Sequence, residues 1–298
     1  MPNILTKISG KKRFSQSNSR QTDQQKADKK LSSAYPMQYI VGSGQSVGMQ
    51  RDHNEDALYT LSSVLSDGKS EELFGLFIIA DGMGGHRNGE IASSVTIRVV
   101  VRYIIDQLYN ILMETQHGTP ALSVQEILAG AVNEAQKAVL QYAPGGGTTL
   151  TIALLLGDQL TLSHVGDSRA YLTYPDGRLE KITKDHSLVQ RLIDLKEIRP
   201  EEAEKHPQKN ILLKAIGQPD PYQPDANTMQ IPEGAGLMLC SDGLWGVVSE
   251  SDLSEILKIE DDPVVACQKM VDAANKGGGP DNISVIYVQI AQSEERND

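Results

Sequence analysis

From Tyr39 onward, the spacing of apolar and polar residues predicts a globular domain that contains both strands and helices. Residues 73–80 form an uninterrupted apolar run, which is typical of a buried strand. Apolar residues at helical spacing predict long helices over 88–113 and 123–142, and Ser123 is the expected N-cap of the second helix. Further strands are predicted over 148–156, 160–166, 169–174, 236–241 and 283–290, and a further helix is predicted over 263–275.

The order of these elements indicates the fold class. Strands, two long helices and then several strands joined by hairpin-type turns favour an α+β fold with antiparallel sheets over a parallel βαβ fold. Residues 184–225 are polar and contain prolines, so only short helical pieces are expected there, over 187–195 and 200–205. Residues 1–35 have almost no large apolar side chains, which predicts a disordered tail, and residues 293–298 form a short polar tail.

Charge is distributed unevenly along the chain. The whole chain has a net charge of −11, but residues 1–35 hold eight basic and two acidic residues. The remainder is therefore strongly acidic, which argues against a general nucleic-acid binder and suits a protein that holds cations. The basic tail is expected to be solvated, with docking on an acidic partner or a membrane surface as the alternative.

The cysteines and the lengths of the apolar runs indicate in which cellular compartment the protein is expected. Cys240 and Cys267 lie in apolar surroundings, which predicts buried thiols in a reducing environment. We find no uninterrupted apolar run of about 18 residues and no apolar region of a secretory signal. We therefore expect a cytoplasmic protein without a membrane span.

Acidic residues recur where predicted strands end or begin. Asp81, Asp167 and Asp242 each follow a strand, and Asp281 precedes one. A single Asp-Gly after a strand is usually a turn, but the repetition, together with the pair Glu55 and Asp56, favours a carboxylate cluster. Because adjacent antiparallel strands run in opposite directions, we expect Asp81, Asp242 and Asp281 at one sheet edge. Oxygen ligands alone suit Mg²⁺ or Mn²⁺ better than Zn²⁺, and a pair of such ions about 3.5–4 Å apart activates water.

Six short motifs occur in order along residues 38–291, and together they resemble the protein phosphatase 2C family in its bacterial form. Each motif is weak by itself, but six in the same order at plausible distances are specific. The motifs are Arg51-x-x-Asn-Glu-Asp56, Asp81-Gly-Met-Gly-Gly-His86, Gly147-Thr-Thr149, Gly166-Asp-Ser-Arg169, Ser241-Asp-Gly243 and Gly279-Pro-Asp-Asn-Ile-Ser284.

The resemblance implies a four-layer sandwich of two antiparallel β-sheets flanked by α-helices. It places the phosphatase domain over 36–292 and a flap beside the active site over 184–225. It also implies that two Mn²⁺ or Mg²⁺ ions activate a water molecule, which removes phosphate from phosphoserine or phosphothreonine in one step. The implied metal ligands are Asp81, the carbonyl of Gly82, Asp242 and Asp281, with Glu55 and Asp56 acting partly through water. Arg51 is the implied clamp for the substrate phosphate.

Two positions differ from parts of the family. Met83 stands where animal members have the histidine proposed as general acid, which leaves metal-bound water, His86 or no general acid as alternatives. Gly246 stands where some relatives have an acid for a third metal. Asp167 either helps Asp242 to hold a third ion or only caps its turn. Similarly, residues 185–187 either belong to the flap or cap a helix.

The predicted partners are phosphorylated proteins, the products of a serine/threonine kinase, and the chain is expected to act as a monomer without nucleic acid. Two other functions fit the same fold. One is a catalytically inactive regulatory binding module, and the other is a different metallohydrolase such as a phosphodiesterase. The complete set of implied site residues favours the phosphatase: Arg51, Glu55, Asp56, Asp81, Asp242 and Asp281.

Overall fold

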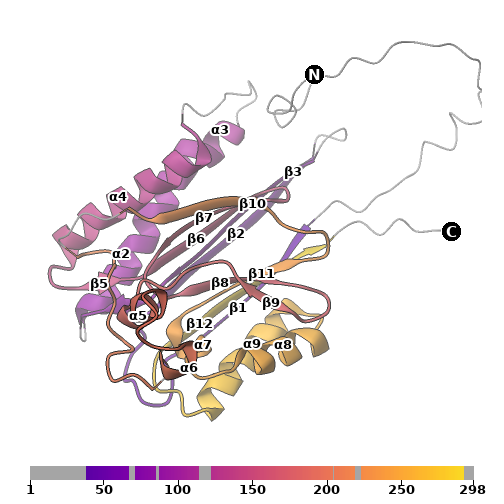
Figure 1. The fold of residues 1–298 in the computed structure, drawn as a ribbon. Helices are drawn as coiled ribbons and strands as arrows, with labels where there is room; N and C mark the ends of the chain where they lie inside the picture. The colour runs from indigo at the N-terminus through magenta and orange to yellow at the C-terminus, as the bar shows by residue number, and fades with distance from the viewer. Residues whose placement is uncertain are drawn as a thin grey trace, which may run out of the picture.

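The computed structural model describes residues 38–66, 71–84, 87–113, 122–203, 205–218 and 223–291 of the 298-residue chain. Two five-stranded antiparallel sheets face each other, with helices on both outer faces (Figure 1). The predicted four-layer α+β sandwich is confirmed. The expected tails at 1–35 and 293–298, and His86, lie outside the described residues.

The first sheet has the strand order β1-β12-β11-β8-β9. Its strands are β1 (Gln38–Ser46), β12 (Ile283–Ala291), β11 (Gly236–Cys240), β8 (Arg169–Thr173) and β9 (Leu179–Lys181). The second sheet has the order β10-β7-β6-β3-β2. Its strands are β10 (Asp225–Gln230), β7 (Gln159–Val165), β6 (Leu150–Leu156), β3 (Glu71–Ala80) and β2 (Ala57–Ser66). A short ribbon pairs β4 (Gly82–Met83) with β5 (Gly147–Thr148).

Helices cover the outer face of each sheet. On the second sheet lie α2 (Arg87–Ile104), the π-helical turn η2 (Ile105–Tyr109), α3 (Asn110–Leu112) and α4 (Val124–Tyr142). On the first sheet lie α7 (Asp242–Trp245), α8 (Glu250–Ile259) and α9 (Pro263–Lys276). Residues 184–225, called the flap after the prediction, contain α5 (Leu188–Asp194) and α6 (Pro200–Ala203). Among the described residues, no helix combines the length and apolar character that crossing a membrane requires.

Strand β3 shows why residues 73–80 are apolar without interruption. Leu76 and Ile78 pack against the helices α2 and α4, whereas Phe77 and Ile79 pack between the two sheets. Because successive side chains point to opposite faces, a strand buried on both sides needs apolar residues at every position. All four side chains are fully buried.

Helix α4 confirms the predicted helix and its N-cap. The Ser123 hydroxyl accepts from the Glu126 backbone N–H, and the Glu126 carboxylate accepts from the Ser123 backbone N–H at 2.8 Å. This reciprocal capping box satisfies two N–H groups that the helix itself leaves free. The helix predicted over 88–113 is also present, but it contains the π-helical turn η2, which its apolar spacing did not predict.

Several elements were missed. Strands β1, β2, β9 and β10 and helices α7 and α8 have no strong apolar period, because most of these elements are short or exposed on one side. Cys240 and Cys267 are free and buried, as predicted.

Candidate active site

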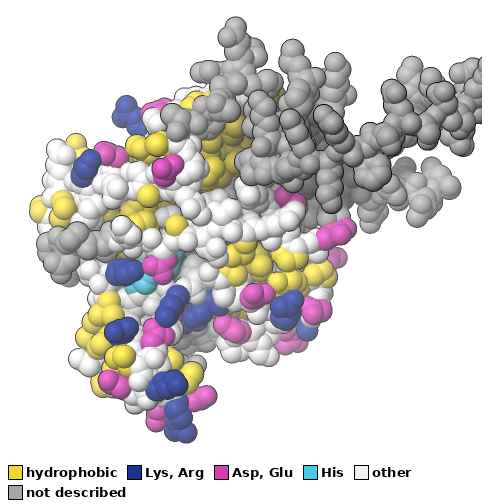
Figure 2. All heavy atoms as spheres, turned by 45° about the horizontal axis from the view of Figure 1, so that its top comes forward, with side chains coloured by type: hydrophobic (Ala, Val, Ile, Leu, Met, Phe, Trp, Pro, Cys, Tyr) yellow, Lys and Arg dark blue, Asp and Glu magenta, His cyan; other side chains and the backbone are white. Residues whose placement is uncertain are grey.

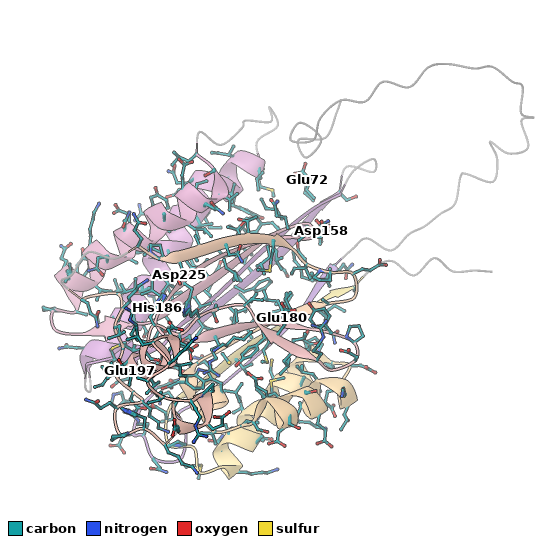
Figure 3. All side chains as sticks on the ribbon, in the orientation of Figure 1. Glu72, Asp158, Glu180, His186, Glu197 and Asp225 are labelled. Carbon is teal, nitrogen blue, oxygen red and sulfur yellow. The ribbon has the colours of Figure 1, made fainter. Side chains whose placement is uncertain are left out.

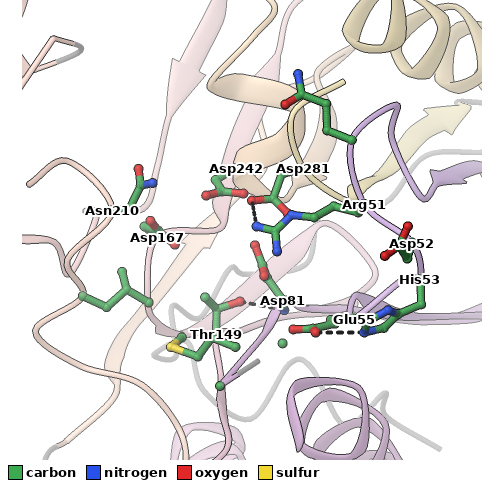
Figure 4. A pocket seen from close by; sticks show the side chains of 15 residues that line it. Arg51, Asp52, His53, Glu55, Asp81, Thr149, Asp167, Asn210, Asp242 and Asp281 are labelled. Carbon is green, nitrogen blue, oxygen red and sulfur yellow. Dashed lines mark hydrogen bonds and ion pairs between the residues drawn. The ribbon is translucent and has the colours of Figure 1, made fainter. Parts of the chain in front are cut away.

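A pocket of about 400 Å³ opens where corresponding ends of the two sheets meet. Five of the predicted acids line it: Glu55, Asp81, Asp167, Asp242 and Asp281. Arg51 lines it too, and the labelled side chains in Figure 4 converge from loops that follow or precede different strands. Asp56 lies behind them, buried at 9% exposure, with its carboxylate bonded to the Ser241 hydroxyl at 2.9 Å.

The acids do not share one sheet edge, and this part of the prediction was wrong. Asp242 comes two residues after the end of β11, and Asp281 comes two residues before β12, its antiparallel neighbour. Asp81 follows β3, which belongs to the other sheet. The pocket therefore forms across the sandwich, because the stacked sheets bring these strand ends together.

The backbone of Asp81 is held by the two threonines that follow Gly147. The Asp81 N–H donates to the Thr149 hydroxyl at 2.9 Å, and its carbonyl accepts from the Thr149 N–H at 2.8 Å. The Thr148 hydroxyl donates to the same carbonyl at 2.9 Å. The sequence predicted only a strand entry at these threonines, so their contact with Asp81 was missed.

Gly82 occupies a position that has no room for a side chain. A Cβ on Gly82 would lie 2.4 Å from the Gly89 carbonyl oxygen and 2.5 Å from that of Glu55. The backbone of Gly82 therefore runs close to the loop that carries Glu55. The pocket is lined by Gly82 and by Met83, the residue at the position of the animal histidine.

Burial and mutual repulsion raise the pKa of four aspartates. Burial, then nearby carboxylates, raises the pKa of Asp56 to about 7 and that of Asp167 to about 8. Burial also raises the pKa of Asp242, with a further contribution from Asp281. For Asp81, burial and the charges of Asp56 and Asp242 raise the pKa well above its ordinary value. Protons or cations must relieve such repulsion.

The donor set fits hard divalent cations, although two of the acids are already engaged with other side chains. Among the described residues, no three His, Cys, Asp or Glu side chains are grouped closely enough to hold an ion as they stand. Asp281 forms an ion pair with Arg51 at 2.7 Å, and Asp56 bonds to Ser241. The second oxygen of Asp56, Oδ1, is buried without a hydrogen-bond partner. A buried oxygen without a donor, among carboxylates that repel one another, is suited to an Mg²⁺ or Mn²⁺ ion.

Asn282 joins the loop that carries Arg51 and Glu55 to the start of β12. Its side-chain oxygen accepts from the Glu55 N–H at 2.8 Å, and its amide nitrogen donates to the carbonyls of Val47 and His53, both at 2.9 Å. The Glu55 carboxylate contacts His53 Nε2 at 3.0 Å. Asn282 belongs to the motif that contains Asp281, but sequence reasoning gave it no role.

The flap contributes Asn210 and Leu212 to the pocket lining. The family resemblance predicted a flap over 184–225 but singled out neither residue. Ser187 caps α5 by accepting from the Gln190 N–H, which confirms the capping alternative for that residue. The neighbouring His186 and Asp225 pair at 3.1 Å and are labelled together in Figure 3, where they join the flap to β10.

The fold and the pocket define the class: a two-sheet α+β sandwich with a carboxylate pocket suited to divalent cations. Within this class, the chain belongs to the protein phosphatase 2C family, whose model matches residues 44–263.

Similar proteins agree with this assignment. The chain is 36% identical over 248 residues to the serine/threonine protein phosphatase PstP of Mycobacterium tuberculosis, covering 82% of this chain and 43% of that protein. It thus spans less than half the length of that relative. It is 35% identical to the serine/threonine phosphatase stp of Listeria innocua, covering 81% of this chain and 92% of that protein. A crystal structure of the PstP catalytic domain in complex with two manganese ions matches with a TM-score of 0.69 at 30% identity, covering 86% of this chain and 100% of that one.

Proposed function

We propose that this chain is a protein phosphatase that hydrolyses phosphoserine and phosphothreonine in one step with two Mn²⁺ or Mg²⁺ ions. The observation that carries the proposal is the convergence of Arg51 and five acids on one pocket, where burial and repulsion raise aspartate pKa values. The two manganese ions in the PstP structure support the same metal requirement here.

In this proposal, Asp81, the Gly82 carbonyl, Asp242 and Asp281 hold the cations, and Glu55 and Asp56 complete the site partly through water. When bound, the ions supply positive charge and lower the pKa of a water molecule. Thr148 and Thr149 hold the Asp81 backbone in place, which keeps its carboxylate directed into the pocket.

Arg51 is proposed to bind the substrate phosphate. Its side chain is half exposed and pairs with Asp281 through one guanidinium nitrogen. Once turned away from Asp281, the planar guanidinium has two parallel N–H donors for two phosphate oxygens. Such donors stabilise the charge that the equatorial oxygens carry during phosphoryl transfer.

The proposed substrates are phosphorylated proteins made by a serine/threonine kinase, which approach the pocket beside Asn210 and Leu212 of the flap. Two buried free thiols support a reducing compartment, for which we propose the cytoplasm, and we propose a monomer as the working unit.

The test is hydrolysis of p-nitrophenyl phosphate with Mn²⁺, with EDTA, and by the Asp242→Asn variant. We expect EDTA to abolish turnover and Asp242→Asn to lower kcat about 100-fold or more, because a charge that anchors the transition state is lost. Asp261→Asn, at an exposed aspartate between α8 and α9, is the control and should behave as the parent.

Three outcomes would count against the proposal. Turnover that survives both EDTA and Asp242→Asn would mean a different chemistry. A folded protein without turnover on p-nitrophenyl phosphate or a phosphopeptide would indicate a regulatory binding module. Faster hydrolysis of bis-p-nitrophenyl phosphate than of the monoester would indicate a phosphodiesterase.

A further inference from the structure

The turn that carries Asp167 is fixed by contacts from several distant segments. The Trp245 indole N–H donates to the Asp167 carbonyl at 3.0 Å. On one side of Asp167, the Gly166 N–H donates to His186 Nδ1 at 3.1 Å, and the His186 N–H donates to the Gly166 carbonyl at 2.7 Å. On the other side, the hydroxyls of Ser168 and Thr149 are 2.8 Å apart. The backbone of this turn therefore has little freedom to move.

Arg169 stacks on the Trp245 ring and is itself held by Asp185. The guanidinium carbon of Arg169 lies 3.5 Å from the centroid of the Trp245 ring. Arg169 also donates from Nε to Asp185 Oδ1 at 3.1 Å and from Nη2 to Oδ2 at 2.7 Å, a two-pronged pair. The pair is well shielded from water, with side-chain exposures of 17% for Arg169 and 6% for Asp185. A planar guanidinium can form this pair and stack on an aromatic ring at once, whereas a lysine cannot.

Trp245 connects two acids of the pocket. It lies three residues after Asp242 in the one-turn helix α7, while its indole holds the Asp167 carbonyl. The two carboxylates line the same pocket and lie near each other in Figure 4. Because one rigid side chain joins their backbones, the separation of Asp167 and Asp242 depends on the position of Trp245.

We propose that Trp245, Arg169 and Asp185 form a positioning bracket that holds Asp167 at a set distance from Asp242. The bracket would keep these two carboxylates in place for the third divalent cation that the family resemblance offers, in addition to the two cations of the proposed function. The bracket consists of positioning residues only, since it acts through Asp167. Asp185 is the second residue of the flap, so the bracket also connects the flap to this cation position. The inference deepens the proposed function and rests on it for the identity of the cation.

The chain contains a matched pair that lacks the connection to the pocket. Arg178 stacks on Tyr174 at 3.5 Å and pairs with Glu180 at 3.4 Å in the neighbouring β8–β9 hairpin. Both charged side chains of that pair are more than half exposed, and neither lines the pocket. Arg178→Lys therefore makes the same chemical change as Arg169→Lys without disturbing Asp167.

The experiment is calorimetric titration of the metal-free full chain with Mn²⁺, for the parent and for Trp245→Phe, Arg169→Lys, Arg178→Lys and Asp167→Asn. Trp245→Phe keeps an aromatic face for Arg169 but removes the indole donor. We expect Trp245→Phe and Arg169→Lys to weaken the weakest Mn²⁺ site about 10-fold, as the loss of a residue that orients a ligand does elsewhere. Asp167→Asn should abolish the same site, and Arg178→Lys should leave every site unchanged.

Fluorescence gives a second readout, because Trp245 is the single tryptophan of the chain. In the parent, Mn²⁺ binding at the weakest site should change its emission, and in Arg169→Lys the change should shift to higher Mn²⁺ concentration. Parental affinity at every site in both Trp245→Phe and Arg169→Lys would overturn the bracket, and so would an Asp167→Asn variant that binds Mn²⁺ as the parent does. If Arg169→Lys does not fold, Trp245→Phe alone decides.

Failure of the proposed function gives a different pattern. A chain that shows these Mn²⁺ responses but hydrolyses no phosphomonoester would contradict the phosphatase proposal and support the bracket. A chain that hydrolyses phosphomonoesters but binds Mn²⁺ equally in all variants would contradict the bracket alone.

Discussion

At the scale of single residues, identical side-chain types acquire different properties from their surroundings. Asp261 is exposed, whereas Asp167 has 7% of its surface exposed and a pKa raised to about 8 by burial and by Asp242. Desolvation and like charge both disfavour the ionised form, so the clustered acids are poised to exchange protons for a cation. At neighbouring positions such as Gly243, the room available for a side chain limits the residue type as much as charge does.

Gly243 gives the first prediction. A Cβ at this position would lie 2.0 Å from the Asn282 carbonyl oxygen, and backbone cannot give way as a flexible side chain does. Gly243→Ala should push Asp242 and Asp281 apart, lowering the free energy of unfolding by about 1–3 kcal/mol, as overpacking does, and weakening Mn²⁺ binding. Urea denaturation and Mn²⁺ titration check both effects. Parental values in both would show that the loop accommodates a methyl group.

At the scale of elements, a local sequence motif predicts an element boundary where nearby residues satisfy the backbone hydrogen bonds of that boundary. The N-terminus of α4 is capped by Ser123 and Glu126, which are three residues apart in the sequence. Helix α2 continues into a π-helical turn, where Tyr109 meets Phe74 edge-on with ring centroids 4.9 Å apart. The turn thus packs against β3, a contact that the period of the helix alone does not indicate.

The second prediction concerns the α4 cap. Ser123→Ala removes the hydroxyl that accepts from the Glu126 N–H, so the free energy of unfolding should fall by about 1 kcal/mol. Hydrolysis of p-nitrophenyl phosphate should be unchanged, since neither residue lines the pocket. Asn133→Ala, at an exposed position inside α4, is the control and should be neutral or slightly stabilising. A loss of stability in the control equal to that in Ser123→Ala would rule out the cap as the cause.

At the scale of the whole molecule, the acidic cluster lies at one end of the sandwich. On the face shown in Figure 2, basic and acidic side chains alternate rather than forming one basic surface. The cluster is therefore the feature whose ionisation should dominate the response of the molecule to pH and to metals.

The third prediction is that the metal-free protein loses stability as pH rises from 6.5 to 8. Raised pKa values mean that native Asp56, Asp81 and Asp167 still hold protons where the unfolded chain has released them. Stability carried by such groups is complete at low pH and is lost as pH passes their native pKa values. Burial lowers the pKa of His164 to about 4 and also lowers that of His186, and these groups act in the opposite direction, mainly below about pH 6.5.

Urea denaturation in EDTA at pH 6.5 and 8.0 measures this effect, and a decrease of about 2 kcal/mol is expected for one carboxyl group across this window. Saturating Mn²⁺ should remove the decrease, because cations bind the ionised carboxylates. Asp167→Asn in EDTA should show a smaller decrease than the parent. Stability that rises with pH in EDTA would contradict the native protonation of these aspartates.

The sequence by itself determined the α+β class, the capped helix α4, the doubly buried strand β3 and most of the acids of the pocket. These features carry local signals: a period, a cap, or an acid directly after an apolar run. Residue type and order were sufficient to identify them, and the six ordered motifs added the family resemblance.

Only the tertiary structure decided which sheet each acid comes from and which residues hold it. Thr149 lies 68 residues from Asp81, and Trp245 lies 78 residues from Asp167. Edge strands such as β9 and β10 depend on their neighbours for hydrogen bonds. Contacts of this kind arise when distant segments pack together, so no local pattern of apolar and polar residues can specify them.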